Sequence, residues 1–244
     1  MIYSAMKDYM YDKILGAGSL GEGSTTSLYR KTLELIPHGS RILDVGIGNG
    51  TCTIANLDII QEKELKITGI DIDSDYISAA KQKIMISKGS NNVTADVQDL
   101  LTIEGQKWDY VLFSESYPVI DSKLMSLMWR KSFELLNPNG SLLMIHNLCD
   151  HPTFIFKYFK KNAKYLTLID FGKTTSMKDF ESHLGDNSLR IKNKKVLFPL
   201  SMSNYPEHIR GSFLANMLAL ITGTSYGNEW RNNNQWFFEI EEIK

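Results

Sequence analysis

The sequence predicts a doubly wound α/β fold, in which a seven-stranded sheet is mostly parallel and has an antiparallel edge strand. Five short apolar runs alternate with helical patterns between residues 40 and 147, as in a parallel sheet covered by helices on both faces. A glycine-rich segment follows the first run directly. Two further strand-like runs near the C-terminus supply the remaining strands, because helical stretches separate them from the βα alternation.

The five core strands follow from short runs of apolar and β-branched residues. They are expected at residues 41–45, 65–71, 92–97, 108–113 and 141–147. In such a sheet, ligands bind at the carboxyl ends of the strands, beside the point where the strand order reverses. The residues directly after each strand are therefore the candidates for a functional site.

Three helices are expected between these strands. The first runs from the glycine-rich segment to about Gln61, and the second covers 74–86 with Asp73 or Ser74 as its N-cap. The buried face of the second helix is expected to hold Ile77, Ala80 and Ile84. The apolar stripe of the third is expected to hold Leu124, Leu127, Met128 and Leu135.

The whole chain, residues 1–244, is expected to form a single domain with three parts. Residues 1–39 are interpreted as a helical lid with a helix at 28–36, and residues 40–147 as the core. Residues 148–244 are expected to lie on the substrate side. This last part is expected to contain helices at 153–161 and 177–184, strands at 189–200 and 234–243, and a helical insertion at about 201–230.

Composition argues against several classes of protein. The 244 residues carry a formal net charge of −1, so no global field draws the chain to nucleic acid or to an anionic membrane. The longest apolar stretch, 213–222, is about half of the ~20 residues that a membrane span requires. The N-terminus carries charges within its apolar run, unlike a signal peptide. Cys52 and Cys149 are the only cysteines, which suits a reducing compartment, and we expect a cytoplasmic protein.

The glycine-rich segment, residues 41–55, reads RILDVGIGNGTCTIA, with glycines at positions 46, 48 and 50. A strand that runs into a glycine loop and then a helix is typical of nucleotide-binding proteins. A dinucleotide fold requires G-x-G-x-x-G, yet the sixth position is Thr51. A Walker phosphate loop requires a lysine after its last glycine, and none follows Gly50. The spacing disfavours both phosphate-binding motifs.

Acidic residues stand at the ends of the first three strands. Asp44 would repel a pyrophosphate and would attract an ammonium or a sulfonium. Asp71 ends the second strand, where its carboxylate can accept two hydrogen bonds from ribose hydroxyls. Asp96, in the third strand, can accept a hydrogen bond from an adenine amino group. Together they favour a cationic aminoacyl-nucleoside as the ligand.

The segments LDVGIGNG, GIDID, TADVQDL, WDYVLFSES and LLNPNGSLLMI resemble, in this order, the motifs of class I S-adenosylmethionine-dependent methyltransferases. The resemblance covers about residues 40–147, and Asn139 departs from it by replacing a common glycine. It implies a Rossmann-like fold and methyl transfer from S-adenosylmethionine, with S-adenosylhomocysteine as the product. The cofactor-binding residues that it implies are Asp44, Gly46, Gly48, Asn49, Gly50, Asp71, Ile72, Asp96, Val97 and Ser114.

The segment Ser114–Pro118, SESYP, follows the fourth strand, where acceptor and sulfonium are expected to meet. It lacks the paired prolines and the leading amide of methylases that act on nucleobases or glutamine amides, which argues against those acceptors. The candidate catalytic residues are Glu115, Tyr117 and His146. Glu115 can orient an amine or take its proton, and a histidine beside the cleft can act as a base. The alternatives are a solvated loop acid and a merely hydrogen-bonded strand histidine.

Aromatic residues outside the core are the candidates for binding the acceptor. Tyr11, Tyr117 and Tyr205 are interpreted as substrate-binding, the first as part of the lid, although a packed helix face is an equal alternative for it. Two lysine-rich tracts, at 157–164 and 190–195, could bind RNA phosphate, but such tracts are usually solvated faces. No His, Cys or Asp cluster has metal-ligand spacing, so no metal is expected.

The leading hypothesis is a monomeric or homodimeric enzyme that methylates a small molecule, on nitrogen in preference to oxygen, without a nucleic-acid or membrane partner. One alternative is an RNA or protein methyltransferase. A second uses the same cofactor to transfer its aminocarboxypropyl group, and a third is a non-catalytic binding module. The acceptor itself is not encoded in any motif that the sequence shows.

Overall fold

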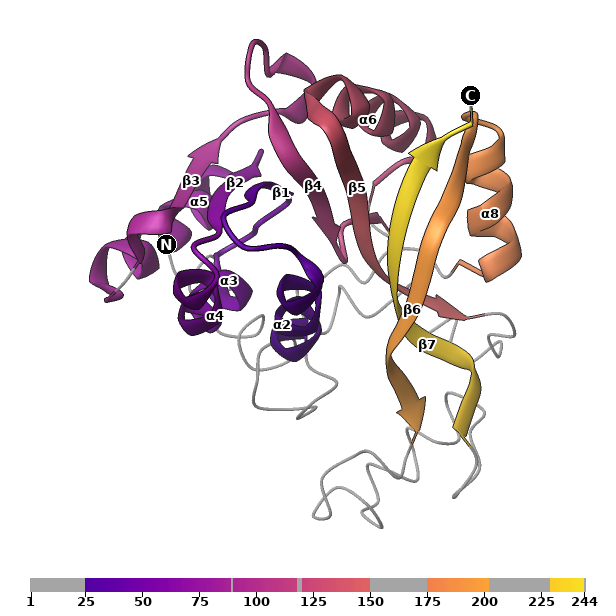
Figure 1. The fold of residues 1–244 in the computed structure, drawn as a ribbon, viewed down its shortest axis with the longest axis horizontal. Coiled ribbons are helices and arrows are strands. Elements are labelled where there is room, and N and C mark those ends of the chain that lie inside the picture. The colour runs from indigo at the N-terminus through magenta and orange to yellow at the C-terminus, as the bar shows by residue number, and fades with distance from the viewer. Residues whose placement is uncertain (1–24, 89, 118–119, 150–174, 202–228, 244) are drawn as a thin grey trace.

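The computed structural model describes residues 25–243 apart from 89, 118–119, 150–174 and 202–228 (Figure 1). In this part of the chain seven strands form one sheet, in the order β3-β2-β1-β4-β5-β7-β6. The first five strands are parallel, whereas β7 runs antiparallel to both β5 and β6. The predicted doubly wound, seven-stranded sheet is confirmed, and its antiparallel pairing lies at the β7–β6 edge.

All seven expected strands are present, with bounds that differ by a few residues. The strands are β1 (Arg41–Val45), β2 (Lys66–Asp71), β3 (Val93–Val97), β4 (Trp108–Ser114), β5 (Leu136–Cys149), β6 (Leu189–Ser201) and β7 (Glu229–Glu242). The helices are α2 (Thr25–Leu35), α3 (Thr51–Ile54), α4 (Leu57–Glu62), α5 (Ser74–Ile86), α6 (Ser122–Leu135) and α8 (Met177–Gly185), with short 3₁₀ turns η2 (Ser90–Asn92) and η3 (Leu100–Thr102).

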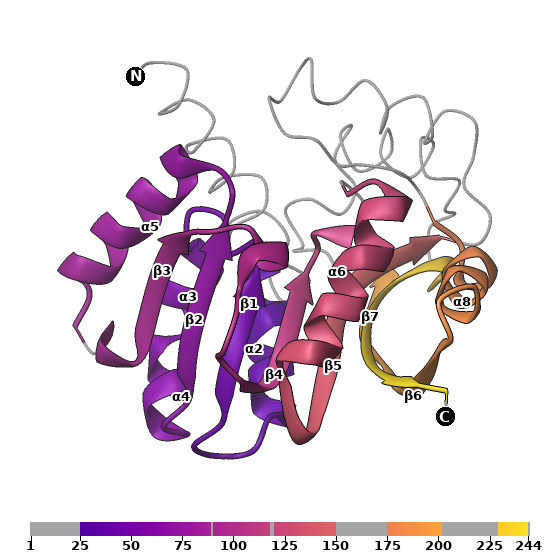
Figure 2. The ribbon, with the colours of Figure 1, turned by 90° about the horizontal axis from the view of Figure 1, so that it is seen from above.

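Helices cover both faces of the sheet, with α2 and α6 on opposite sides (Figure 2). On one face, Leu33 of α2 and Leu143 of β5 belong to one buried cluster, and α5 lies on β3 beside α3. On the other face, Trp129 of α6 and Phe180 of α8 belong to a second buried cluster. Because side chains alternate along a strand, β5 sends Leu143 to the first face and Met144 to the second.

The expected start and buried face of α5 are confirmed. Asp73 is the N-cap, and its carboxylate accepts hydrogen bonds from the backbone N–H groups of Asp75 and Tyr76. Ile77 and Ala80 are buried on the sheet side. This cap fixes the chain direction directly after β2, where the candidate site begins.

The expected stripe of α6 is half right. Leu135 is buried, and Met128 packs against the buried cluster on the same face. Leu124 and Leu127 are 42% and 49% exposed, whereas Met125 and Trp129 are buried, together with Leu135. The helix carries two apolar rows one residue apart, and the row that contains the large Trp129 ring packs against the sheet.

The single helix expected after the glycine loop is two helices, α3 and α4. Asn56 lies at the break, and its side-chain amide donates to the carbonyl oxygens of Cys52 and Thr26. An asparagine that bonds to nearby backbone groups in this way competes with the helical ladder.

Several expectations fall outside the described residues, namely the helix at 153–161, most of the insertion at about 201–230, and Tyr11 and Tyr205. The expected helix at 28–36 is present as α2, where Leu28, Tyr29 and Leu33 are buried against the sheet. Within the described ranges, no helix has the length and apolar character that crossing a membrane requires.

A close approach joins β2 to the loop after β1. A Cβ atom built on Gly69 would lie 2.9 Å from Cβ of Ile47 and closer still to Cδ1 of the same side chain. Ile47 is itself packed against Ile77 and Ala80 of α5. Only a residue without a side chain therefore fits at position 69 while Ile47 stays in place.

Replacing Gly69 with alanine is expected to lower the free energy of unfolding by about 1–3 kcal/mol, because the added Cβ must displace Ile47 or the backbone around it. Denaturant unfolding measures this change. The matched control is Gly185→Ala at the end of α8, where an added Cβ meets no described atom within 4 Å. The control is expected to be neutral or stabilising by up to ~1 kcal/mol. Equal stabilities of the two variants would contradict the steric argument.

Candidate functional site

The glycine loop, residues 46–50, lies at the carboxyl end of β1, beside the reversal of strand order between β1 and β4. The backbone N–H groups of Gly46 and Ile47 both donate to the carbonyl oxygen of Ile70, at 2.8 and 3.1 Å. The three glycines have positive φ angles of 81°, 60° and 72° in chain order. Residues with a side chain adopt such angles at a cost. Glycines therefore stand at the three positions where the loop bends over the end of β2.

Asp71, the last residue of β2, fixes the middle of the loop. Its Oδ2 accepts a hydrogen bond from the backbone N–H of Gly48 at 3.1 Å, and its Oδ1 accepts one from Asp73 at 3.0 Å. A carboxylate oxygen has two lone pairs, so each retains one for a ligand. The structure thus brings Asp71 and Gly48, both expected cofactor-binding residues, together at one edge of the sheet.

Asp44 lies on the α2 side of β1 and is only 2% exposed. Its Oδ2 accepts a hydrogen bond of 2.7 Å from the hydroxyl of Tyr29, and its buried Oδ1 has no hydrogen-bond partner among the described residues. Burial, and to a smaller extent the charge of Asp71, raises the pKa of Asp44 to about 7, against the lowering effect of the Tyr29 hydrogen bond. Burial also raises the pKa of Tyr29, so its hydroxyl remains a donor.

Two of the loop glycines lie against neighbouring elements. A Cβ on Gly46 would lie 3.4 Å from Cβ of Ser116, which follows β4, and a Cβ on Gly50 would lie 3.2 Å from Cβ of Ala80 in α5. The Oγ of Ser116 is buried and has no hydrogen-bond partner among the described residues. The loop is therefore held between the segment after β4 and the first turns of α5.

Asn49 is fully buried and holds the start of α3. Its Oδ1 accepts hydrogen bonds from the backbone N–H and from the hydroxyl of Thr51, at 3.2 and 2.9 Å. Lys83 of α5 donates to the same hydroxyl at 2.7 Å. The structure thus shows a positioning contact for Asn49 within the loop.

Three expected cofactor-binding residues, two of them on the adenine side, lie near the ends of β2 and β3. Ile72 and Val97 are 78% and 54% exposed, which is unusual for apolar side chains of this size. The register places Val97 directly beside Asp71. Asp96 forms an exposed ion pair of 3.0 Å with Lys81, a contact worth about 0–1 kcal/mol.

Ser114 ends β4 beside β5, and Glu115 follows it. Ser114 pairs with Ile145 in the parallel register, and the backbone N–H of Glu115 donates to the carbonyl oxygen of Ile145 at 2.9 Å. Glu115 has a φ angle of 58°, which is uncommon for a non-glycine residue. The chain therefore turns sharply at Glu115, the position expected to face the acceptor.

Tyr117 packs on the opposite face of the sheet from Asp44, with 2% of its surface exposed. Its ring stacks on Trp129 at 5.8 Å, and its hydroxyl lies 2.9 Å from Nδ1 of His183 in α8. Nε2 of His183 lies 3.1 Å from the hydroxyl of Ser126, which itself donates to a backbone carbonyl. The hydroxyl of Ser126 therefore accepts from Nε2–H, which leaves Nδ1 to accept the proton of Tyr117. Burial raises the pKa of Tyr117 to about 12.

His146 is fully buried on the same face as Tyr117. The two rings lie 4.9 Å apart in an edge-on arrangement, and Phe180 lies 6.3 Å from the histidine ring. The structure thus brings two candidate catalytic residues together, and it places them across the sheet from Asp44. Their catalytic roles stay predictions.

Three residues that lie at or near the candidate site were given no role of their own by the sequence. They are Tyr29, His183 and Ser116, the last within the candidate segment Ser114–Pro118. Tyr29 lies on the buried face of α2, together with Leu28 and Leu33. Its position on an apolar helix face indicates burial, but no sequence signal pairs it with a carboxylate on β1. His183 likewise lies one residue before a buried leucine of α8, and only its position against α6 shows the contact to Tyr117.

The lysine-rich strand β6 is largely neutralised by carboxylates. Ion pairs join Arg190 to Glu241 and Lys192 to Glu239, both at 2.7 Å, and Lys194 to Glu181 at 3.4 Å. This arrangement favours a solvated face over a phosphate-binding tract. Within the described ranges, no three His, Cys, Asp or Glu side chains come close enough to hold a metal ion.

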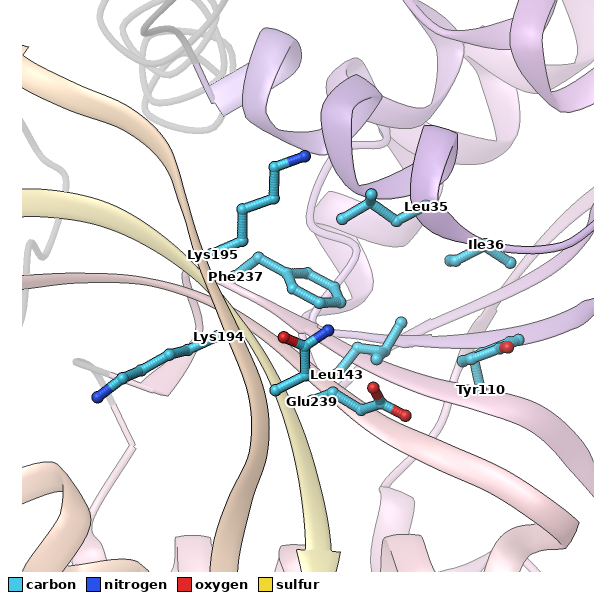
Figure 3. A pocket seen from close by; sticks show the side chains of 9 residues that line it. Leu35, Ile36, Tyr110, Leu143, Lys194, Lys195, Phe237 and Glu239 are labelled. Carbon is cyan, nitrogen blue, oxygen red and sulfur yellow. The ribbon is translucent and has the colours of Figure 1, made fainter.

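A shallow depression of about 320 Å³ lies between the end of α2 and the β5–β7–β6 part of the sheet (Figure 3). Leu35, Leu143 and Phe237 form its apolar part, and the carboxylate of Glu239 lies at its rim. It includes no residue of the glycine loop, and Tyr110 lines it four residues before the end of β4. The depression is therefore distinct from the edge where the loop and Asp71 meet.

Comparison with known proteins identifies relatives over most of the chain. A family model described as a methyltransferase domain matches residues 36–234. The putative methyltransferase YqeM of Bacillus subtilis (strain 168) is 30% identical over 145 residues, which cover 59% of this chain and 54% of that protein. Ribosomal protein L11 methyltransferase of Staphylococcus aureus (strain JH1) is 30% identical over 122 residues, 49% of this chain and 36% of that protein. The chain thus spans about half the length of the first relative and less of the second.

Solved structures share the fold at low sequence identity. The crystal structure of geranyl diphosphate C-methyltransferase from Streptomyces coelicolor A3(2), in complex with Mg²⁺, geranyl diphosphate and S-adenosyl-L-homocysteine, aligns with a TM-score of 0.64 at 12% identity. The alignment covers 89% of this chain and 78% of that chain. It supports the Rossmann-like fold that the motifs imply.

Replacing Tyr117 with phenylalanine is expected to lower the free energy of unfolding by about 0.5–1.5 kcal/mol, because the buried Nδ1 of His183 loses its donor. The measurement is denaturant unfolding at neutral pH. The matched control is Tyr110→Phe, which removes a hydroxyl at the open depression and is expected to change the stability less. A loss equal to that of the control would contradict the assigned hydrogen bond.

Proposed function

Because the chain belongs to the methyltransferase domain family, we propose that it transfers a methyl group from S-adenosylmethionine to a small-molecule acceptor, with nitrogen favoured over oxygen. The observation that carries the proposal is Asp71, whose carboxylate is fixed by backbone donors at the loop and keeps lone pairs for ribose hydroxyls. The buried Asp44 beside the same loop suits a cationic ligand and disfavours a pyrophosphate.

The nucleoside end of the cofactor is proposed to lie over the ends of β2 and β3. Ile72 and Val97 expose apolar side chains there, and a planar base that covers them removes apolar surface from water. Asp96 can bond to the amino group of the base because its surface ion pair with Lys81 is weak. Gly46, Gly50 and Asn49 shape the loop that the amino-acid end approaches, and Ser114 closes the site from β4.

The proposed role of Glu115 is to hold the acceptor and take its proton. When bound, the cofactor would supply a methyl group on a cationic sulfur; the acceptor lone pair would form the new bond to the methyl carbon, and the sulfur would leave with the carbon–sulfur electron pair. Positioning provides much of the acceleration in such a step. A nitrogen acceptor also loses a proton, and the carboxylate of Glu115, at the sharp turn after β4, is the group proposed to receive it. His146 is the alternative base, with Tyr117, Tyr11 and Tyr205 as proposed substrate contacts.

A macromolecular acceptor is the main alternative, since one relative carries the name of a ribosomal protein methyltransferase. Three cationic side chains of β6 are engaged in ion pairs, and the net charge is −1, so little favours an RNA partner. Transfer of the aminocarboxypropyl group is the other alternative, because the same cofactor site serves both reactions. A small-molecule acceptor fits these observations better.

The deciding experiment incubates the chain with S-adenosylmethionine and separate panels of small amines, phenols, RNA and ribosomal protein. Mass spectrometry is expected to find an amine product heavier by one CH₂ unit, together with S-adenosylhomocysteine. Release of methylthioadenosine with a heavier adduct would establish the aminocarboxypropyl alternative. If the chain neither binds S-adenosylhomocysteine nor transfers any group, the proposal is wrong.

Asp71→Ala is expected to weaken S-adenosylhomocysteine binding at least tenfold, because each hydrogen bond to a charged group contributes about 1.5–3 kcal/mol. Isothermal titration calorimetry measures the dissociation constant. Asp75→Asn, an exposed carboxylate in the first turn of α5, is the matched control and is expected to bind like the wild type. An unchanged affinity for Asp71→Ala would reject the ribose assignment.

Glu115→Gln is expected to lower kcat for an amine acceptor by about 10²–10⁴-fold, the usual contribution of a general base, and to leave S-adenosylhomocysteine affinity unchanged. Steady-state kinetics with the best amine of the panel measures this effect. Glu104→Gln, which changes an exposed loop carboxylate, is the control. A kcat equal to that of the control would exclude Glu115 as the general base.

A further inference from the structure

We propose that Asp44 binds the amino-acid ammonium of the ligand and gives up a proton when it does so. Tyr29, which donates a hydrogen bond to Asp44, sets the pH of this exchange. The inference rests on the proposed function, because it needs a ligand with an ammonium at the glycine loop. It adds to that function a positioning residue and a pH dependence of cofactor binding.

The geometry of Asp44 leaves one oxygen for a ligand. Oδ2 is bound to the hydroxyl of Tyr29 at 2.7 Å, and Tyr29 is itself held in the core by α2 and lies 3.4 Å from the hydroxyl of Thr53. Oδ1 is buried and has no hydrogen-bond partner among the described residues. A buried carboxylate oxygen without a donor is costly, so a donor supplied by the ligand has a large effect here.

The surroundings of Oδ1 indicate where the donor arrives. Gly46 and Gly48 lie two and four residues after Asp44. The buried Oγ of Ser116, which also has no hydrogen-bond partner in the described part of the chain, lies beside Gly46. Two buried polar atoms without a described hydrogen-bond partner thus lie next to the same loop, Oδ1 of Asp44 on β1 and Oγ of Ser116 after β4. An ammonium has three N–H bonds, so one that donates to Asp44 keeps two for other acceptors.

No cation among the described groups offsets the charge of Asp44. The titratable groups that face the pair are Asp71 of β2, which raises the pKa of Asp44, and Cys52 of α3, which faces Tyr29. On the β4 side the register places Leu112 beside Asp44. With a pKa of about 7, Asp44 holds a proton in a large fraction of ligand-free molecules below neutral pH.

A cation beside Asp44 favours the ionised carboxylate, so binding below pH 7 releases the proton to the buffer. Above pH 7 the carboxylate is already ionised, and no proton is released. Affinity therefore rises with pH up to about 7 and is constant above it. Because the Tyr29 hydrogen bond lowers the pKa of Asp44, removing that hydroxyl moves the transition to higher pH.

The test titrates the full chain with S-adenosylhomocysteine between pH 5.5 and 7.5, in buffers of different ionisation enthalpy. For the wild type, the dissociation constant is expected to fall by up to tenfold per pH unit below pH 7, with up to one proton released per ligand. Methylthioadenosine, which lacks the amino-acid end, is expected to bind without proton release. Asp44→Asn is expected to show a flat pH profile and no release.

Tyr29→Phe is the decisive variant, since it keeps the ring and removes only the donor to Asp44. The pH below which its affinity falls is expected to be higher than that of the wild type. At pH 7.5 the variant is therefore expected to release a proton still and to bind S-adenosylhomocysteine more weakly than the wild type does. Tyr110→Phe, at the distinct depression, is the matched control and is expected to reproduce the wild-type profile.

The outcomes separate this inference from the proposed function. Absence of S-adenosylhomocysteine binding at every pH would overturn the proposed function itself. Binding with a flat profile and no proton release in the wild type would overturn the proton linkage and leave the function intact. A Tyr29→Phe transition at the wild-type pH would overturn the role of Tyr29. The wild-type profile needs no variant, so the linkage stays testable even if Asp44→Asn does not fold.

Discussion

The whole candidate site depends on one steric constraint, the absence of a side chain at residue 69. The side chain of Ile47 occupies the space where that side chain would lie, and it packs onward against α5. With Ile47 in this position, the loop backbone donates hydrogen bonds to the carbonyl oxygen of Ile70 and to the carboxylate of Asp71. A glycine in the middle of a strand therefore determines the geometry of a different loop.

The sheet also separates two buried polar groups of residues. Asp44 and Tyr29 lie on the α2 face, whereas Tyr117, His146 and His183 lie on the α6–α8 face. Both groups include residues near the carboxyl ends of the parallel strands: Asp44 lies in β1, and Tyr117 lies in the segment after β4. The sheet thus carries a buried carboxyl on one face and a packed aromatic cluster on the other.

The core of the fold could be predicted because its determinants are local. Strand runs, the glycine spacing and the cap at Asp73 each act over a few residues, and their order along the chain is enough to specify a doubly wound sheet. Half of the α6 stripe was wrong because Leu124 and Leu127 form an equally regular apolar row, and only packing selects the row with Trp129. The contacts of Tyr29 and His183 were missed because each joins segments that become neighbours only in the folded chain.

The outermost described strand, β6, shows how the sheet ends. Its register against β7 shifts at three places, Pro199 lies within it, and lysines project from it. Irregular pairing, proline and charge each hinder the docking of a further strand. The opposite edge, β3, has only five residues. Extension of the sheet from one molecule into another is therefore disfavoured at both edges, and a homodimer of this chain would have to form through helices or loops.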